Sequence, residues 1–304
     1  MVTSHESPPP NIEETLLARR HDIVVDNRRV AYTHTGAGER VCVLIHGMGG
    51  CAAHWALTVP ALAPNRRVFA LDLPGFGDSE MPTEPGVEPV VRIVEAIRAM
   101  TGVDRLDLIG HSMGTLLACE VAARRPEIVR RMVLASGPIT SVVSLFHSPI
   151  ATLRRDPALA NFLVEAATAG IPLPRRLQDA IVDVAWVRRL AMSPYVPHPD
   201  HLPDSTVRHF LSGAGGPGTF STLRQGLGYD FTPALAGVKC PILLIGGQQD
   251  KIAPEADLRA FAAATTSVQN VEIIAETGHL PMLEQPEIFN KSVEKFLNAT
   301  DRPT

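Results

Sequence analysis

The sequence predicts an α/β protein whose mostly parallel sheet is interrupted once by a helical insertion. Three observations support this prediction. Apolar runs that suit buried strands alternate with helix-forming runs between about residues 41 and 135. The alternation stops between about residues 139 and 229, a stretch with helical periodicity and many prolines but no convincing strand. It resumes at residue 241 and continues to a last helix that ends near residue 298.

The first half of the chain supplies strands and helices in strict order. Asp26-Asn27 lies between two apolar segments and predicts a hairpin turn. The next apolar run, residues 41–45, is apolar at every position, as expected of a strand covered on both faces. The strands predicted here are 21–25, 29–33, 41–45, 67–71, 106–109 and 131–135, and the helices are 51–63, 90–100 and 113–125.

The second half contains the insertion and the end of the sheet. Within the insertion the periodicity predicts helices over 158–169, 177–191 and 206–211, followed by a glycine cluster at 213–218 that suits a hinge. Beyond it we expect strands at 242–245 and 271–274 and helices at 254–264 and 286–298. The predicted organisation is a mobile tail at 1–20, a core at 21–138 and 230–304, and a helical cap at 139–229.

The bulk composition excludes several classes of function. The chain has 304 residues, 45% of them hydrophobic and 20% charged, which is ordinary for a soluble globular protein. A net charge of −4 gives no reason to expect nucleic acid or an anionic membrane as a partner. No signal peptide or membrane-spanning run is evident, so we expect a cytoplasmic protein that binds a small-molecule substrate. The oligomeric state is not readable from the sequence.

The four cysteines predict neither a metal centre nor a disulfide framework. They are scattered and form no CxxC pair, and three of them lie in or beside apolar segments where a free thiol behaves as a small hydrophobic group. We therefore expect no cofactor and no metal. The residues concerned are Cys42, Cys51, Cys119 and Cys240.

Ser112 is the candidate nucleophile. It lies in Gly110-His111-Ser112-Met113-Gly114, directly after an apolar strand and before a helix-forming run. A serine on such a sharp turn needs small neighbours where strand and helix nearly touch, and glycine supplies the room. The first amides of the following helix point at the place where an oxyanion would form. The pattern predicts acyl transfer by Ser112.

A serine nucleophile needs a base, and the base needs a carboxylate. His279 follows the last predicted strand, and Asp250 follows the strand at 242–245. Because parallel strands present their carboxyl ends at one sheet edge, we expect both side chains near Ser112. The alternative for Asp250 is that it only caps the helix that starts near Pro254. We give His111 no chemical role, and we expect Asp72 to stabilise a turn.

Five motifs in order give the chain a family resemblance. It resembles the α/β-hydrolase fold superfamily, in the branch with a helical cap inserted after the sixth core strand. The resemblance covers nearly the whole chain beyond the N-terminal tail. The motifs are His46-Gly47-Met48-Gly49, Asp72-x-x-Gly75-x-Gly77-x-Ser79, Gly110-x-Ser112-x-Gly114, Gly246-Gly247-x-x-Asp250 and Gly278-His279.

The resemblance implies the site and the activity. It implies a Ser112–Asp250–His279 triad and an oxyanion hole formed by the backbone N–H groups of Met48 and Met113. The implied function is a serine hydrolase that acts on a carboxylic ester, a thioester or a lactone. Serine at the sharp turn between strand and helix argues against epoxide hydrolases and haloalkane dehalogenases, which use aspartate at this position. Alternatives are a C–C bond hydrolase of a vinylogous diketone, a cofactor-free haloperoxidase or perhydrolase, and a non-catalytic small-molecule binding protein of this fold.

Overall fold

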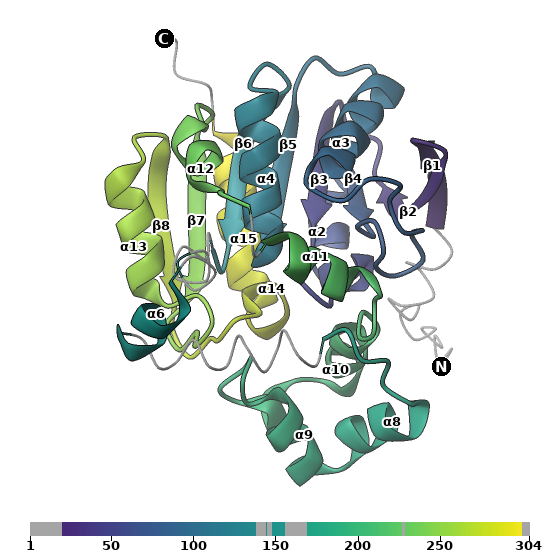
Figure 1. Cartoon of the computed structure of the whole chain (residues 1–304), viewed down its shortest axis with the longest axis vertical. Helices are drawn as coiled ribbons and strands as arrows, with labels where there is room; N and C mark the ends of the chain where they lie inside the picture. Colours follow the sequence, from purple (N-terminus) through teal and green to yellow (C-terminus); the bar gives the residue numbers. More distant parts are fainter. Residues whose placement is uncertain (1–19, 138–143, 145–147, 156–168, 227–228, 300–304) are drawn as a thin grey trace, which may run out of the picture.

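An eight-stranded sheet forms the centre of the protein (Figure 1). The computed structural model describes residues 20–137, 144, 148–155, 169–226 and 229–299. The strands occur across the sheet in the order β1-β2-β4-β3-β5-β6-β7-β8. Their bounds are β1 Arg20–Val25, β2 Arg28–Thr35, β3 Arg40–Ile45, β4 Arg66–Leu71, β5 Leu106–His111, β6 Val129–Ala135, β7 Ile242–Gly247 and β8 Val268–Ile274.

The sheet is mostly parallel, as the sequence predicts. Strand β2 pairs antiparallel with both β1 and β4, and every other neighbouring pair is parallel. The β1–β2 hairpin turns through Asp26 and Asn27, which adopt φ values of 53° and 59°. Asparagine and aspartate tolerate this left-handed region better than other non-glycine residues, which explains the turn.

Helices cover both faces of the sheet. Val41, Val43 and Ile45 of β3 pack in one hydrophobic cluster with α3, α4 and α13, whereas Cys42 and Leu44 pack in a second cluster with α2, α14 and α15. Burial on both faces explains why β3 is apolar from Val41 to Ile45. The helices are η1 Ala52–Trp55, α2 Val59–Leu62, α3 Glu88–Thr101, α4 Met113–Arg124, α12 Thr232–Gly237, α13 Glu255–Ala264, α14 Pro281–Glu284 and α15 Pro286–Asn298.

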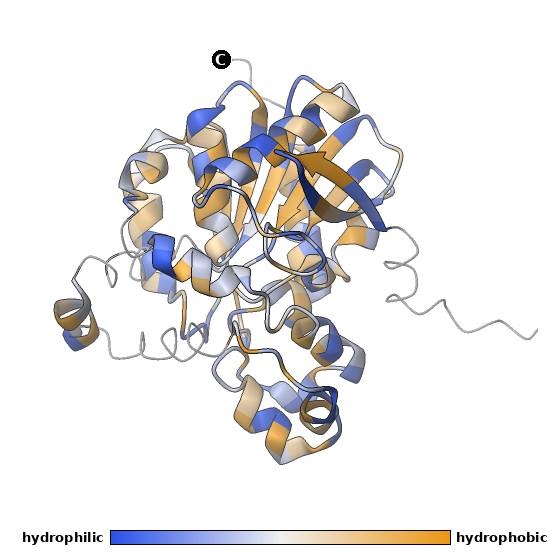
Figure 2. Cartoon of the chain, turned by 45° about the vertical axis from the view of Figure 1, so that its right-hand side comes forward, coloured by the Kyte–Doolittle hydropathy of each residue, from blue (hydrophilic) through white to orange (hydrophobic). Residues whose placement is uncertain are grey.

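In the described residues between β6 and β7, all the regular elements are helices, joined by turns and loops. In Figure 1, α8, α9 and α10 lie below the carboxyl edge of the sheet, and α11 lies closer to α4. Figure 2 shows the middle strands as predominantly hydrophobic, while the helices at the bottom of the view mix both kinds of residue. The elements are α6 Pro149–Arg155, α8 Arg175–Asp183, α9 Ala185–Met192, η3 Pro199–His201, α10 Asp204–Leu211 and α11 Gly218–Gly226.

Several predicted elements differ in the structure. The expected helix over 51–63 is two short pieces, η1 and α2, because Pro60 lacks an N–H and suits the start of a new helix. The expected helix over 177–191 breaks at Val184, whose extended backbone (φ −111°, ψ 108°) ends α8 and begins α9. The glycine cluster at 213–218 leads directly into α11, which the sequence did not predict.

The remaining predicted elements of the core are present with shifts of a few residues at their ends, and β1 begins at Arg20, inside the predicted tail. The predicted tail up to residue 19 and residues 158–168 of the predicted cap helix lie outside the described residues. All four cysteines are free thiols. None of the helices that the structure describes is both long enough and apolar enough to cross a membrane.

Candidate active site

Ser112 lies at the sharp turn between β5 and α4. Its backbone has φ 51° and ψ −120°, a conformation that non-glycine residues rarely adopt. Two glycines permit the close approach of strand and helix: a Cβ on Gly110 would lie 2.4 Å from the carbonyl oxygen of Gly114, and a Cβ on Gly114 would lie 2.3 Å from that of Ile45. The turn thus holds a strained serine, only 4% exposed, at the end of a central strand.

The loop after β3 passes directly beside this serine. A Cβ on Gly47 would lie 2.9 Å from the Cβ of Ser112, so only glycine fits there. His46 fixes the loop: its Nε2 accepts the N–H of Leu73 at 3.0 Å, and its Nδ1 donates to the carbonyl of Gly47 at 2.7 Å. Burial lowers the pKa of His46 to about 4, which keeps the ring in the neutral form that these two bonds require.

His279 and Asp250 form a buried pair on neighbouring loops. Nδ1 of His279 lies 3.0 Å and 2.9 Å from the two carboxylate oxygens of Asp250. The carboxylate is further fixed because its Oδ1 accepts the N–H groups of Ile252 and Ala253, both at 2.8 Å. Both side chains are almost fully buried, so the carboxylate selects the tautomer with its proton on Nδ1.

His111 joins the histidine loop to the serine turn. Its Nε2 donates to the carbonyl oxygen of His279 at 2.8 Å, and the two rings lie 4.9 Å apart between centroids. Burial is the main reason that the pKa of His111 lies well below its usual value, so the ring is neutral. The residue before Ser112 therefore fixes the backbone of His279, a positioning contact that the sequence did not indicate.

Glu284 is a second residue that the sequence analysis missed. Its carboxylate accepts the N–H of Gly278 (2.9 Å to Oε2, 3.0 Å to Oε1) and the N–H of Leu280 (2.9 Å to Oε1). These two amides flank His279, so Glu284 holds the histidine loop from both sides. A partial signal is its place close after the proposed base, at the end of the short helix α14, from which an acid can reach back to the N-cap amide of Leu280.

An apolar cavity opens beside Ser112. The cavity has a volume of about 100 Å³, and Ser112, Met48 and Met113 all contribute to its wall. The other walls come from the loop between β4 and α3, from the first turns of α4, and from α11 with the residues that follow it. Representative lining residues are Phe76, Val90, Leu117, Leu223 and Phe231.

Helix α11 is attached to the opposite wall of the cavity at both ends. The N–H of Gly218 donates to the carbonyl of Gly75 at 2.8 Å. At the other end, Oε1 of Gln225 accepts the N–H of Gly86 at 2.6 Å, while its Nε2 donates to Ser221 at 2.9 Å. A segment from the insertion therefore forms a fixed wall, although the glycine cluster before it suggested a hinge.

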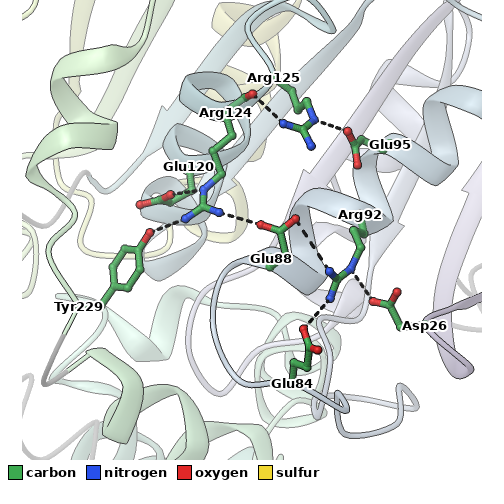
Figure 3. A network of polar contacts seen from close by, with 9 residues as sticks. All are labelled: Asp26, Glu84, Glu88, Arg92, Glu95, Glu120, Arg124, Arg125 and Tyr229. Atoms are coloured by element: carbon green, nitrogen blue, oxygen red, sulfur yellow. Dashed lines mark hydrogen bonds and ion pairs between the residues drawn. The ribbon is translucent and has the colours of Figure 1, made fainter.

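A network of ion pairs and hydrogen bonds joins α3, α4 and Tyr229 (Figure 3). Arg124 of α4 contacts Glu120 and Glu88 and donates to the hydroxyl of Tyr229 at 2.8 Å. Arg92 of α3 extends the network to Glu88, Glu84 and Asp26. Because Tyr229 also lines the cavity, the network fixes the position of one cavity wall against α4.

The predicted site residues fall into two groups. Ser112, Met48 and Met113 border the cavity, and His279 and Asp250 contact each other on the adjoining loops. Asp72 stabilises the turn after β4, since its carboxylate accepts the N–H group of Asp78. It also accepts the N–H group of Ala52 from the segment after β3. In the parts of the chain that the structure describes, no three His, Cys, Asp or Glu side chains are grouped as metal ligands.

Comparison with known proteins gives relatives of several activities. The chain is 28% identical over 284 residues to a 2-hydroxy-6-oxononadienedioate/2-hydroxy-6-oxononatrienedioate hydrolase of Klebsiella pneumoniae subsp. pneumoniae, covering 88% of this chain and 91% of the relative. It is 25% identical over 276 residues to a proline iminopeptidase of Heyndrickxia coagulans, covering 88% and 93%. The structure matches that of the enol-lactonase from Burkholderia xenovorans LB400 with a TM-score of 0.66 and 24% identity, over 92% of this chain and all of the other (100%).

These relatives share the fold and a hydrolytic activity but differ in the bond that their names describe. The model of the alpha/beta hydrolase family matches residues 42–292, which include every strand from β4 to β8 and all the candidate site residues. The chain belongs to the alpha/beta hydrolase family.

Proposed function

We propose that the protein is a serine hydrolase of a small-molecule carboxylic ester, with thioesters and lactones as neighbouring substrate classes. The observation that supports this most is the buried His279–Asp250 pair, whose histidine backbone is hydrogen-bonded to His111, the residue before a strained serine. Such a pair can take a proton from a hydroxyl and stabilise the positive charge that results.

In the proposed mechanism Ser112 attacks the acyl carbon while His279 takes its proton. Asp250 holds the imidazole through Nδ1 and stabilises the imidazolium. The N–H groups of Met48 and Met113 stabilise the oxyanion, and Met113 suits this role because an N–H in the first turn of a helix has no partner within the helix. His279 then protonates the leaving group, and water hydrolyses the acyl-enzyme by the same steps. We further propose that residues 139–229 act as the cap over this site.

A C–C bond hydrolase is the second candidate. The relative from Klebsiella pneumoniae is named as a hydrolase of unsaturated 6-oxo-dioates, and its similarity covers most of both chains. The same serine, histidine and aspartate would serve that reaction. The two proposals differ in the substrate, so a direct comparison of substrates separates them.

The test combines active-site labelling with a substrate screen. A fluorophosphonate probe is expected to label the wild type and not Ser112→Ala. Ser136→Ala is the matched control, because Ser136 is also buried, ends the neighbouring strand and has a positive φ of 48°. Ser136→Ala is expected to be labelled like the wild type. An absence of labelling in folded wild-type protein would contradict the proposal.

The screen uses p-nitrophenyl esters beside a thioester and a vinylogous diketone. The ester is expected to have the highest kcat/KM. Turnover of the diketone with no ester turnover would replace the ester proposal with the C–C proposal. Labelling without turnover of any of the three compounds would leave a binding protein of this fold as the better explanation.

A further inference from the structure

The described wall of the cavity includes the serine turn but not the histidine loop. Its wall includes Ser112, Met48 and Met113, but neither His279, Asp250 nor any residue of the loop from Gly278 to Glu284. In the proposed mechanism the leaving group must receive its proton from His279, so the leaving group lies on the histidine side. The cavity is therefore available to the acyl group.

The part of the cavity wall that the structure describes is uncharged. Among its described lining residues there is no Lys, Arg, His, Asp or Glu side chain. Three of the polar side chains there bond to the protein: Gln225 bonds to Gly86 and Ser221, and the Tyr229 hydroxyl accepts from Arg124. A carboxylate inside this cavity would lose its hydration without gaining a cation, which is strongly unfavourable.

The size of the cavity limits the acyl group. A dry cavity of about 150 Å³ lined by aliphatic and aromatic residues can hold benzene. The cavity beside Ser112 has a volume of about 100 Å³, and its far walls are fixed by the attachments of α11. It therefore suits an acyl chain of about four to six carbons.

We propose that this cavity is the acyl-binding site and that it selects apolar acyl groups of about four to six carbons over acyl groups of the same length that end in a carboxylate. This proposal rests on the proposed serine hydrolase function and adds its substrate class: esters of short, uncharged monocarboxylic acids. The leaving alcohol is not restricted by this cavity.

The first test compares matched esters. The p-nitrophenyl ester of butanoic acid is expected to have a kcat/KM about tenfold above that of the acetyl ester, because two more methylene groups are buried. The hexanoyl ester is expected to exceed the p-nitrophenyl monoester of hexanedioic acid by about a hundredfold or more, since the two differ only in a terminal methyl or carboxylate group. Equal rates, or a preference for the hexanedioic monoester, would overturn the proposal.

The second test changes the cavity wall. Thr222 lines the cavity on α11 and is only partly buried, so larger side chains there are compatible with folding. Thr222→Arg is expected to reduce the preference for hexanoyl over hexanedioyl by about tenfold or more, because it provides a cation. Thr222→Trp is expected to shift the preferred acyl group to acetyl. The control is Arg224→Thr on the exposed side of the same helix, which should change neither preference. Unchanged preferences in both Thr222 variants would contradict the assignment of the cavity.

A binding measurement separates this proposal from the proposed function. Ser112→Ala cannot turn over an ester by the proposed mechanism, so calorimetry can measure its affinity for the hexanoyl and hexanedioyl esters. At least a tenfold preference for the hexanoyl ester is expected. That preference without turnover by the wild type would support the acyl site and contradict the hydrolase. Turnover by the wild type with equal binding in Ser112→Ala would support the hydrolase and contradict the acyl site.

Discussion

The two sides of Ser112 are built in different ways. On one side, His279, Asp250 and Glu284 are held by hydrogen bonds, most of them to backbone amides on loops that follow β7 and β8. On the other side, an apolar cavity is enclosed by a loop of the core and by α11 from the insertion. On the first side, directional hydrogen bonds fix the positions of single atoms. On the second side, a ligand meets only the shape and the apolar surface of the cavity.

The difference assigns reaction and selectivity to separate parts of the chain. The polar side depends on loops at the ends of strands, and the hydrogen bonds of the sheet fix where those strands end. The apolar side depends on how a helix of the insertion lies on a loop, and that can change without moving the strands. Substitutions on the polar side should therefore lower the rate for every substrate, while those on the apolar side should change which substrate is preferred.

The largest effect is expected from the proposed nucleophile and base. Ser112→Ala and His279→Ala should each reduce kcat by about 10⁶-fold, and the double variant should lose little more, because these residues act as a unit. Steady-state kinetics with a p-nitrophenyl ester measures this. His198→Ala, at an exposed histidine, should retain wild-type kcat. Additive losses in the double variant would show that the two residues act independently.

Asp250→Asn should reduce kcat by about 10⁴-fold, because an amide keeps the shape but can hold the wrong imidazole tautomer. KM should change little. Asp257→Asn is the matched change on α13, where the side chain is also buried. If Asp257→Asn had the larger effect, Asp250 would be only the helix cap that the sequence left as an alternative.

Glu284→Ala should reduce kcat by about tenfold to a hundredfold with little change in KM, since the loop would hold His279 less accurately. Glu284→Gln should recover most of this loss, because the amide oxygen can still accept the N–H groups of Gly278 and Leu280. The control is Glu287→Ala at an exposed site on α15. Equal loss in the Gln and Ala variants would show that the charge of Glu284 matters more than its hydrogen bonds.

Gln225→Ala tests the apolar side. Without the bond to Gly86, one attachment of α11 is lost, and KM for the hexanoyl ester should rise by about threefold to tenfold, in line with one hydrogen bond. The acetyl ester, which reaches less of the cavity wall, should be affected less. Arg224→Ala on the same helix is the control. An equal fall of kcat for both esters would show that Gln225 supports the reaction itself and not the selection of the acyl group.

The smallest effect concerns pH and stability. Burial is the largest cause that raises the pKa of Glu284 to about 7, and the nearby Asp250 carboxylate raises it further, while His279 and the two amide bonds oppose the shift. The folded state therefore binds a proton that the unfolded state releases between about pH 4.5 and 7, so Glu284 makes the protein less stable as pH rises through this range. Urea unfolding at pH 5 and pH 8 should show Glu284→Gln gaining stability relative to the wild type at the higher pH. A constant difference between the two proteins would contradict the raised pKa.

The sequence by itself determined the sheet and the candidate reaction residues. Residues 41–45 of β3 are apolar at every position because both faces are covered, and that pattern is local and readable. Asp250 and His279 could be placed at one edge because parallel strands end together. The strained turn at Ser112 could be predicted because the two neighbouring glycines are needed for steric reasons.

Only the tertiary structure decided the contacts between distant segments. Glu284 and His111 fix the backbone around His279 through bonds whose geometry depends on how loops meet, and no periodicity records it. Helix α11 contains glycine, serine and threonine, which are weak helix formers, so its position depends on bonds to Gly75 and Gly86 rather than on local propensity. The predicted helix over 177–191 also breaks at Val184, and the apolar spacing, which runs on through this residue, does not indicate the break. The sequence therefore predicts the reaction, whereas the cavity that limits the substrate arises from the packing of the insertion on the core.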